Sequence, residues 1–349
     1  MTGLSILTLA AASDAYGTWY IKAQTLAASV GFFSMMVITF IDYDALISKM
    51  KLGFFAITIG MLVLVNLFGS GSYGNKNWIT ITGTNISFQP TELVKITFII
   101  VYALHIDRLK DKINHPLSVI QLALHALLIF ALIYKTGDLG MALVYAAIVA
   151  LMLFSSGMSL WYFVGVLAGG VIASPFIWQN LSENRQRRIL VGFNPDLDPL
   201  DKGWQQIACR NCIISGGFRG AGFSGGSKYK TLVAGQSDCL FAVFAEKFGF
   251  IGAFVYIALI TTLILRIIWI SRSTRKNYAS YICIGIAGML IAQTVENIGM
   301  CLGFLPVIGI TLPFFSYGAS SMLSMYLCIG VVQSICAHNK KYYFERESG

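Results

Sequence analysis

The sequence predicts an all-α integral membrane protein, built as one domain over 1–349 with about ten transmembrane helices. Of its 349 residues, 56% are hydrophobic and 12% are charged, and the mean hydropathy is +0.70. Soluble domains carry roughly 25% charged residues, so this composition excludes an ordinary soluble protein. Helices are expected because a segment in lipid must satisfy its own backbone hydrogen bonds.

Apolar runs close to the roughly 20 residues that cross a bilayer mark most of the helices. They cover 22–42, 52–69, 92–106, 117–134, 139–155, 159–178, 240–269, 280–302 and 314–336. The opening stretch 1–13 is apolar but too short to cross, and it lacks the basic start and cleavage-site order of a signal peptide. We interpret it as a shortened first helix; a misplaced start codon would also account for its length.

The distribution of Lys and Arg predicts which side of the membrane each loop occupies. Two or more of these residues occur in each of four segments, at 42–51, 107–116, 271–277 and 338–349. The positive-inside rule places these segments, and therefore both termini, in the cytoplasm. The long loop between the seventh and eighth helices, about 179–237, is then extracytoplasmic.

This long loop carries more cations than anions, which would suit an anionic ligand or lipid head groups. Its candidate binding residues are Arg187, Arg188, Arg210 and Lys228. A basic loop that is merely solvated is the alternative. Six glycines between Gly216 and Gly226 give a backbone that could cradle an anion, or one that is simply a mobile connection.

Cysteine usage gives no clear metal signal. Five of the seven cysteines lie at or within predicted spans, where Cys behaves as a small hydrophobe. Cys209 and Cys212 lie in the long loop, within a short amphipathic helix expected at 204–215. Helical coincidence and a disulfide both account for their spacing. A metal site would need further Cys or His nearby, and the four histidines lie elsewhere.

Ionisable residues within or at the ends of membrane helices are costly and by default functional. Four places qualify: Glu92 with Lys95, Asp138, Asp238 with Glu246, and Glu296 with Asn297. Glu92 and Lys95 fall on one helix face and could form a purely structural pair. Asp138 could simply cap the helix that follows it.

Two further segments have polar character. Residues 69–92 are expected to form a compact, turn-rich loop around Trp78. Residues 305–324 mix Pro, Gly and Ser in apolar surroundings, and the candidates there are Ser316, Ser320 and Ser321. Small residues let helices approach closely, which favours a packing role. A hydroxyl-lined ligand surface is the alternative.

These features together predict an outward-facing site of acidic and basic residues for an anionic, lipid-borne substrate. A secondary transporter is the competing class, because Pro- and Gly-interrupted helices with buried carboxylates also suit transporters. Nothing in the sequence predicts a nucleic acid partner.

Several motifs, in this order, resemble the SEDS family of RodA, FtsW and SpoVE, the multi-pass proteins of bacterial wall synthesis. The most specific stretches are "FQPTELVKI", "DLGMAL", "RRILVGFNPDLDPLDKGWQQ" and "NIGMCLGFLPVIGITLPFFSYGASS". The similarity runs from about Leu4 to Ile335. The segment "IDYDAL" is closer to RodA than to FtsW.

The resemblance implies a ten-helix peptidoglycan glycosyltransferase of the bacterial cytoplasmic membrane. Such proteins polymerise lipid II, the undecaprenyl-pyrophosphate-linked disaccharide-pentapeptide, at the outer face during elongation, division or sporulation. They work with a class B penicillin-binding protein, which is a transpeptidase, and with other proteins of elongation or division complexes. The family's essential Asp corresponds to Asp238, its Q-P-S-E-x-x-K pattern to Gln89, Pro90, Glu92 and Lys95, and its loop Trp to Trp78.

The chemistry of that transfer suits these residues. The 4-hydroxyl of the acceptor sugar must lose a proton as it attacks the anomeric carbon of the donor, and Asp238 is the candidate general base. The charge of the leaving lipid pyrophosphate needs cations, which Arg and Lys or a divalent ion such as Mg²⁺ or Mn²⁺ could supply. No cofactor beyond such an ion is expected.

The sequence departs from the family pattern in several places. The family's His two residues before Asp238 is Gln236, and its G-E-E-L-G reads "AEKFG", with Lys247 in place of the second Glu. Asn77 replaces an Arg that precedes the loop Trp. These changes keep open a non-catalytic scaffold for the penicillin-binding protein. A flippase for lipid-linked precursors, using the same polar helices, is the other alternative.

Overall fold

The computed structural model describes residues 1–71, 76–80 and 87–347 of the chain. These residues form two compact units. The first unit comprises Met1–Thr25, Ser159–Thr262 and Gln293–Gly318, and the second comprises Leu26–Met158, Leu263–Ala292 and Ala319–Gly349. The assignment of the whole chain to a single domain stays a prediction.

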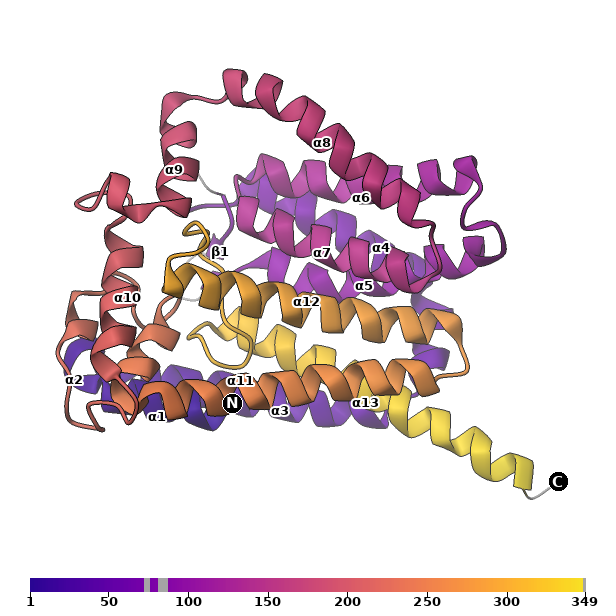
Figure 1. Ribbon diagram of the computed structural model, residues 1–349. Helices are drawn as coiled ribbons and strands as arrows, with labels where there is room; N and C mark the ends of the chain where they lie inside the picture. Colours follow the sequence, from indigo (N-terminus) through magenta and orange to yellow (C-terminus); the bar gives the residue numbers. More distant parts are fainter. Residues whose placement is uncertain (72–75, 81–86, 348–349) are drawn as a thin grey trace. The chain divides into compact units, whose positions relative to one another are not determined.

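Each of the nine predicted spans, and the shortened first helix, coincides with one helix (Figure 1). In chain order these are α1 (Thr2–Ala11), α3 (Trp19–Phe40), α4 (Tyr43–Phe68), α5 (Pro90–Leu109), α6 (Pro116–Lys135), α7 (Leu139–Ser155), α8 (Leu160–Asn180), α11 (Leu240–Ser273), α12 (Asn277–Leu302) and α13 (Ala319–Glu347). Six of them, α3, α4, α6, α11, α12 and α13, are long and apolar enough to cross a membrane. α1, α7 and the first part of α8 are shorter apolar helices, and α5 is long but carries charged residues. The predicted all-α membrane architecture is confirmed.

Capping residues and local backbone angles, which hydropathy does not reveal, determine where some helices begin or kink. α4 begins at Tyr43, well before the predicted start at residue 52, because the Asp42 carboxylate accepts from the Asp44 N–H (2.9 Å) and caps the helix. The backbone at Met50 then departs from helical angles (φ −109°, ψ 20°) and kinks α4 before its apolar part. α11 passes through Gly249, whose φ of 66° lies in the left-handed region that favours glycine.

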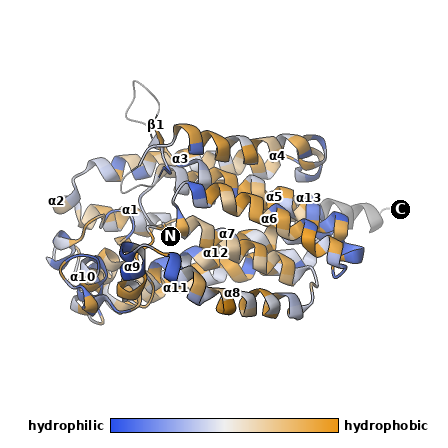
Figure 2. Ribbon diagram, turned by 90° about the horizontal axis from the view of Figure 1, so that it is seen from above, coloured by the Kyte–Doolittle hydropathy of each residue, from blue (hydrophilic) through white to orange (hydrophobic). Residues whose placement is uncertain are grey.

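In the second unit, α5 is the central helix. It packs against α4, α6, α7 and α13 (Figure 1). Most of its residues from Pro90 to Ile106 are buried, and these include Glu92 and Lys95. Hydrophobic residues run along α4 and α6 (Figure 2), as in other membrane-spanning helices. A charged pair therefore lies inside an otherwise apolar bundle.

In the first unit, the long segment predicted as a loop at 179–237 is largely helical. It contains α9 (Glu183–Phe193), the 3₁₀ turn η2 (Pro195–Leu197), α10 (Trp204–Gly216) and the 3₁₀ turn η3 (Lys228–Thr231). α10 matches the short helix expected at 204–215, and it packs against η2 and η3. Hydrophilic residues gather over α9 and α10 (Figure 2). The unit also holds the one-turn helix α2 (Ser13–Tyr16).

A short antiparallel ribbon lies between α4 and α5 in the chain. β1 (Ile79–Thr80) pairs with β2 (Ser87–Phe88), and Trp78 forms a bridge with Ser70. The turn-rich loop predicted at 69–92 falls partly outside the described residues, which omit 72–75 and 81–86.

Candidate functional site

Asp238 lies in the turn just before α11, and hydrogen bonds from distant parts of the first unit hold this turn. The side-chain amide of Asn297, on α12, donates to the Asp238 carbonyl (2.8 Å) and to the Ile310 carbonyl (2.7 Å). The backbone N–H of Tyr317 donates to the Gln236 carbonyl (3.1 Å). Asp238 and Asn297, which were predicted separately as site residues, therefore come together.

The Asp238 side chain is half-buried, and the loop after α12 approaches it closely. Gly309 has a φ of 73°, and a Cβ at this position would lie 3.5 Å from Asp238 Oδ2. Burial raises the pKa of Asp238 to about 6. Such a carboxylate is still mostly ionised at neutral pH, yet it is a stronger base than an ordinary Asp, which suits a general base.

Three buried cysteine sulfurs meet beside the Asp238 turn. The Sγ atoms of Cys209, Cys239 and Cys301 lie within 4.8 Å of one another, and those of Cys209 and Cys239 are 2.8 Å apart. All three are free thiols, as is Cys212, so the disulfide between Cys209 and Cys212 that the spacing left open is not formed. Cys209 on α10 instead meets a residue just before α11 and a residue of α12.

The three thiols could hold a metal ion, but Asp238 is not one of that group. Mg²⁺ and Mn²⁺ require several oxygen ligands, some of which substrate phosphates and water can supply. Within the described ranges, Asp238 belongs to no group of three or more carboxylate, His or Cys ligands. The predicted divalent cation stays a prediction.

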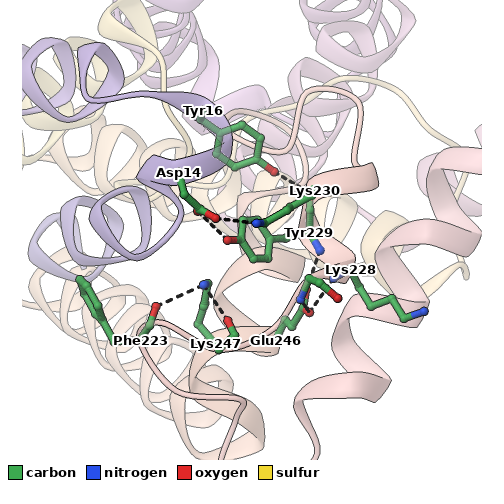
Figure 3. A network of polar contacts seen from close by, with 10 residues as sticks. Asp14, Tyr16, Phe223, Lys228, Tyr229, Lys230, Glu246 and Lys247 are labelled. Atoms are coloured by element: carbon green, nitrogen blue, oxygen red, sulfur yellow. Dashed lines mark hydrogen bonds and ion pairs between the residues drawn. The ribbon is translucent and has the colours of Figure 1, made fainter.

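The Gly-rich segment at 216–226 leads into a turn that folds around Glu246 of α11 (Figure 3). Glu246 Oε1 accepts from the backbone N–H groups of Ser227 and Lys228 (both 2.9 Å), and Oε2 accepts from that of Tyr229 (2.7 Å). Successive N–H groups of this kind form an anion-binding nest. Here the anion is the chain's own carboxylate, so these three N–H groups are already occupied and are not free for a substrate phosphate.

Lys247, the next residue of α11, is buried against the same segment (Figure 3). Its Nζ donates to the carbonyls of Phe223 (3.2 Å) and Gly225 (2.8 Å). The same atom lies 4.2 Å from the centre of the Tyr229 ring, a favourable cation–π distance. Lys247, which departs from the family pattern, therefore has a structural role. It binds carbonyl groups of the same loop whose N–H groups bind Glu246.

Asp14 of α2 ties the N-terminal segment to this loop (Figure 3). It accepts from the Tyr229 hydroxyl (2.6 Å) and pairs with Lys230 (2.7 Å). These two contacts lower the pKa of Asp14 to about 2. The Tyr16 hydroxyl adds a bond to the Tyr229 carbonyl (2.9 Å). The short N-terminal helices are thereby anchored to the Gly-rich loop.

Of the predicted cations of the long loop, Arg187, Arg188 and Lys228 are exposed and Arg210 is partly exposed. None contacts Asp238 by an ion pair or hydrogen bond among the described residues. Arg187 pairs with Asp198 (3.2 Å) and Arg210 pairs with Asp196 (3.4 Å). Lys228 bonds to Glu246 through its backbone, and its side chain extends away from Glu246 (Figure 3). The role of these residues and of Arg188 in substrate binding stays a prediction.

In the second unit, Glu92 and Lys95 form a buried ion pair with 2.8 Å between Oε2 and Nζ. Their side chains are 1% and 0% exposed, so the pairing expected from their spacing is confirmed. Beyond this contact, neither charged group has a hydrogen-bond partner in the described part of the chain. The pair therefore keeps hydrogen-bonding capacity that its neighbours do not use.

Asp138 caps α7 and also collects two side-chain amides. Its Oδ1 accepts from the Met141 N–H (2.9 Å), and its Oδ2 accepts from Asn77 (2.9 Å) and Gln89 (3.2 Å). The capping role considered for Asp138 is confirmed, and burial raises its pKa. Trp78, which follows Asn77, is 40% exposed.

The predicted serine hydroxyls are divided between the two units. In the second unit, Ser320 Oγ accepts from the Gln89 N–H (3.1 Å), and Ser321 is buried. In the first unit, Ser316 Oγ accepts from the Leu312 N–H (2.8 Å). Both observed bonds satisfy backbone N–H groups, and a role of these serines in substrate binding stays a prediction.

Residues 2–341 match the family of FtsW, RodA and SpoVE, which is described as cell cycle proteins. This chain belongs to that family. Among its relatives, the probable peptidoglycan glycosyltransferase FtsW of Trichlorobacter lovleyi is 32% identical over 327 residues, or 92% of this chain and 84% of the relative. The peptidoglycan glycosyltransferase MrdB of Escherichia coli K12 is 34% identical over 293 residues, or 82% of this chain and 77% of the relative.

Solved structures have the fold of this FtsW/RodA/SpoVE protein. A chain from a study of polymerization and crosslinking by a peptidoglycan synthase complex has a TM-score of 0.81 at 25% identity, covering 97% of each chain. The rod shape determining protein RodA of Thermus thermophilus has a TM-score of 0.72 at 23% identity, covering 97% of this chain and 93% of RodA. The predicted family is confirmed, and with it the multi-pass membrane fold and the class of peptidoglycan glycosyltransferases.

Proposed function

We propose that this protein polymerises lipid II into glycan strands, with Asp238 as the general base. Asp238 takes the proton of the acceptor sugar's 4-hydroxyl as that oxygen attacks the anomeric carbon of the donor. The bond from the anomeric carbon to the lipid pyrophosphate breaks, and the pyrophosphate leaves with its negative charge. The observation that carries this proposal is a half-buried carboxylate with a pKa of about 6, in a turn that Asn297 holds.

The cations of the long loop are proposed to bind the pyrophosphate. Arg187 is exposed and Arg210 partly exposed, and they pair with Asp198 and Asp196 over 3.2 and 3.4 Å. Surface pairs of this kind contribute about 0–1 kcal/mol, so a pyrophosphate with more charge can displace the carboxylate. Arg188 and Lys228 are exposed and add to this positive surface.

Residues of the second unit are proposed to contribute to substrate binding as well. The buried Glu92–Lys95 pair and Asp138 lie in a polar region that also includes Ser320 and Ser321, with Trp78 beside it in the chain. Ser316, which belongs to the first unit, is the remaining serine proposed to bind substrate. The unused hydrogen-bonding capacity of Glu92 and Lys95 supports this role.

The reaction is proposed to take place at the outer face of the cytoplasmic membrane. The Lys and Arg distribution supports cytoplasmic termini, which would place Asp238 outside. A class B penicillin-binding protein, together with other elongation or division proteins, is the proposed partner. Support comes from the similarity to a chain of a peptidoglycan synthase complex.

The test is polymerisation of lipid II by the purified protein together with its penicillin-binding partner. Asp238→Asn removes the base without changing size, so we expect the rate to fall roughly 10²- to 10⁴-fold. Asp201→Asn makes the same chemical change at an exposed Asp of the same unit and serves as the matched control. An Asp238→Asn protein that polymerises at the unchanged rate would contradict the proposal.

The same preparation separates the competing functions. A flippase would move labelled lipid II across vesicles and would form no polymer, with or without Asp238→Asn. A scaffold would support growth of cells that carry only Asp238→Ala. The glycosyltransferase proposal requires that neither result is obtained.

A further inference from the structure

The second unit contains a cavity between α4, α5 and α6 that the proposed reaction does not use. Its volume is about 570 Å³, which lies within the range of small-molecule and cofactor sites. The lining combines Lys51 and Arg108 with His105, His125 and apolar side chains. None of these residues takes part in the contacts of Glu92, Asp138 or Asp238 described above.

The cavity carries two cations that form no ion pair with a carboxylate among the described residues. Lys51 and Arg108 are exposed and form no ion pair in the described part of the chain. Asp107, the neighbour of Arg108, pairs with Lys110 (3.7 Å), and Asp44 at the start of α4 pairs with Lys276 (2.6 Å). Asp107 and Asp44 are therefore paired with other cations, and Asp111 forms no ion pair with Arg108 among the described residues. The cations of the cavity thus favour an anion.

The two histidines add a hydrogen-bond donor. Their Nδ1 atoms lie 3.0 Å apart, so one ring donates to the other. When both rings are neutral, the accepting ring carries its own proton on Nε2. This Nε2–H has no hydrogen-bond partner among the described residues, so it is available to an oxygen of a bound anion.

Part of the cavity wall is apolar and exposed, on helices that cross the membrane. Leu52 and Phe55 of α4 are 83% and 41% exposed, and Leu124 and Leu128 of α6 are 60% and 47% exposed. A ligand in this cavity therefore meets cations at one end and hydrocarbon at the other. Basic pockets between transmembrane helices suit lipids that combine a phosphate with acyl chains.

We propose that this cavity binds an anionic phospholipid, with its phosphate at Lys51 and Arg108 and its acyl chains along α4 and α6. A free phosphate ion would satisfy the two cations but would leave the apolar wall without a partner. A zwitterionic lipid would bring its own cation, which Lys51 and Arg108 would repel. The net charge and the apolar surface thus select the same class of ligand.

The test uses the full-length protein in nanodiscs with equal amounts of phosphatidylglycerol and phosphatidylcholine. Native mass spectrometry then measures which lipids stay bound. We expect retention of phosphatidylglycerol, and a loss of affinity of about 25-fold in Lys51→Gln/Arg108→Gln, because each basic residue near an anionic lipid contributes about fivefold. Lys49→Gln/Lys112→Gln removes the same charge at exposed positions outside the cavity and should reduce the affinity clearly less than the cavity variant does.

A second variant, Leu104→Trp, fills the cavity without changing charge and should also reduce phosphatidylglycerol binding. Circular dichroism and thermal unfolding of every variant check that the fold is kept. An equal loss in the cavity variant and in the control would mean diffuse surface attraction and would overturn the proposal. Full displacement of the lipid by inorganic phosphate would identify a free-phosphate site, which also overturns it.

Discussion

At the residue scale, Asp238 differs from Glu246 and Asp138 in how its carboxylate is held. Glu246 and Asp138 each accept three hydrogen bonds from the protein. The Asp238 turn is held through the Asp238 backbone carbonyl, which accepts from Asn297, and the carboxylate itself has a side-chain contact with Ser237. A base must be positioned and yet free to take a proton, and Asp238 meets both conditions.

The pKa of Asp238 predicts how polymerisation depends on pH. The base acts only when ionised, so the rate should be half-maximal near pH 6, fall about tenfold per unit below pH 5 and level off above pH 7. Initial rates on lipid II between pH 4.5 and 8 measure this profile, with light scattering to exclude aggregation. Asp201→Asn should reproduce the profile, and a flat rate over this range would argue against Asp238 as the base.

Some site residues could be predicted from the sequence and others could not. Asp238, Glu92, Lys95 and Asp138 were identifiable because a charge at a helix end in lipid is costly. Gly309 and Cys301 were not, because their contacts with the Asp238 turn join parts of the chain that are far apart in sequence. The family motif "NIGMCLGFLPVIGITLPFF" contains both residues, so the motif could have marked them as site residues. It could not have shown that they contact the Asp238 turn.

At the element scale, α5 depends on its buried charged pair. Lys95→Met leaves Glu92 as an unpaired charge inside the bundle and should lower the free energy of unfolding by about 3–5 kcal/mol. Lys110→Met breaks the exposed pair with Asp107 and should cost less than about 1 kcal/mol. Thermal and denaturant unfolding in one detergent measure both.

The double variant Glu92→Gln/Lys95→Met tests the reason for that loss. Because it removes both charges, it should recover part of the stability that Lys95→Met loses. If the double variant is less stable than Lys95→Met, the unpaired charge of Glu92 does not explain the loss.

The Gly-rich loop should depend on Glu246 in the same direct way. Glu246→Ala removes three charge-assisted hydrogen bonds, each of which contributes about 1.5–3 kcal/mol. Hydrogen–deuterium exchange at the amides of Ser227, Lys228 and Tyr229 should therefore become at least about tenfold faster. Glu183→Ala, at an exposed Glu of α9, should leave these amides unchanged. Unchanged exchange in Glu246→Ala would contradict the described contacts.

Helix positions could be predicted from hydropathy, whereas the structure of the long loop could not. The ten spans correspond to helices because a run of apolar residues has no other stable conformation in lipid. The segment 179–237 has no such constraint, and its form depends on α9, α10 and their contacts with the turns η2 and η3. Its Gly-rich part takes its shape from Glu246 and Lys247, which come later in the chain.

At the scale of the whole molecule, both units contain residues that the family motifs mark. The family match runs over residues 2–341 and so includes both. Asp238 with Asn297 belongs to the first unit, and Glu92 with Lys95 and Asp138 belongs to the second. The motifs therefore do not describe one short segment, and either unit alone carries only part of the family pattern.

The proposed partnership gives a prediction for the full chain. Asp238→Asn should abolish polymerisation and still co-purify with the class B penicillin-binding protein, because the substitution removes one charge from a half-buried side chain and leaves the fold intact. Pull-down from membranes, with quantitative blotting, measures the retained partner against the Asp201→Asn control. Loss of the partner together with activity would mean that Asp238 acts in assembly.

The three thiols beside the Asp238 turn have a practical consequence. Cys239 directly follows Asp238, and it is buried together with Cys209 and Cys301. A buried thiol is alkylated only when its surroundings open, so its labelling rate reports a local opening equilibrium. Iodoacetamide labelling of Cys239, followed by peptide mapping, would measure how often the turn that carries Asp238 opens locally. The protein thus contains its own kinetic probe beside the proposed general base.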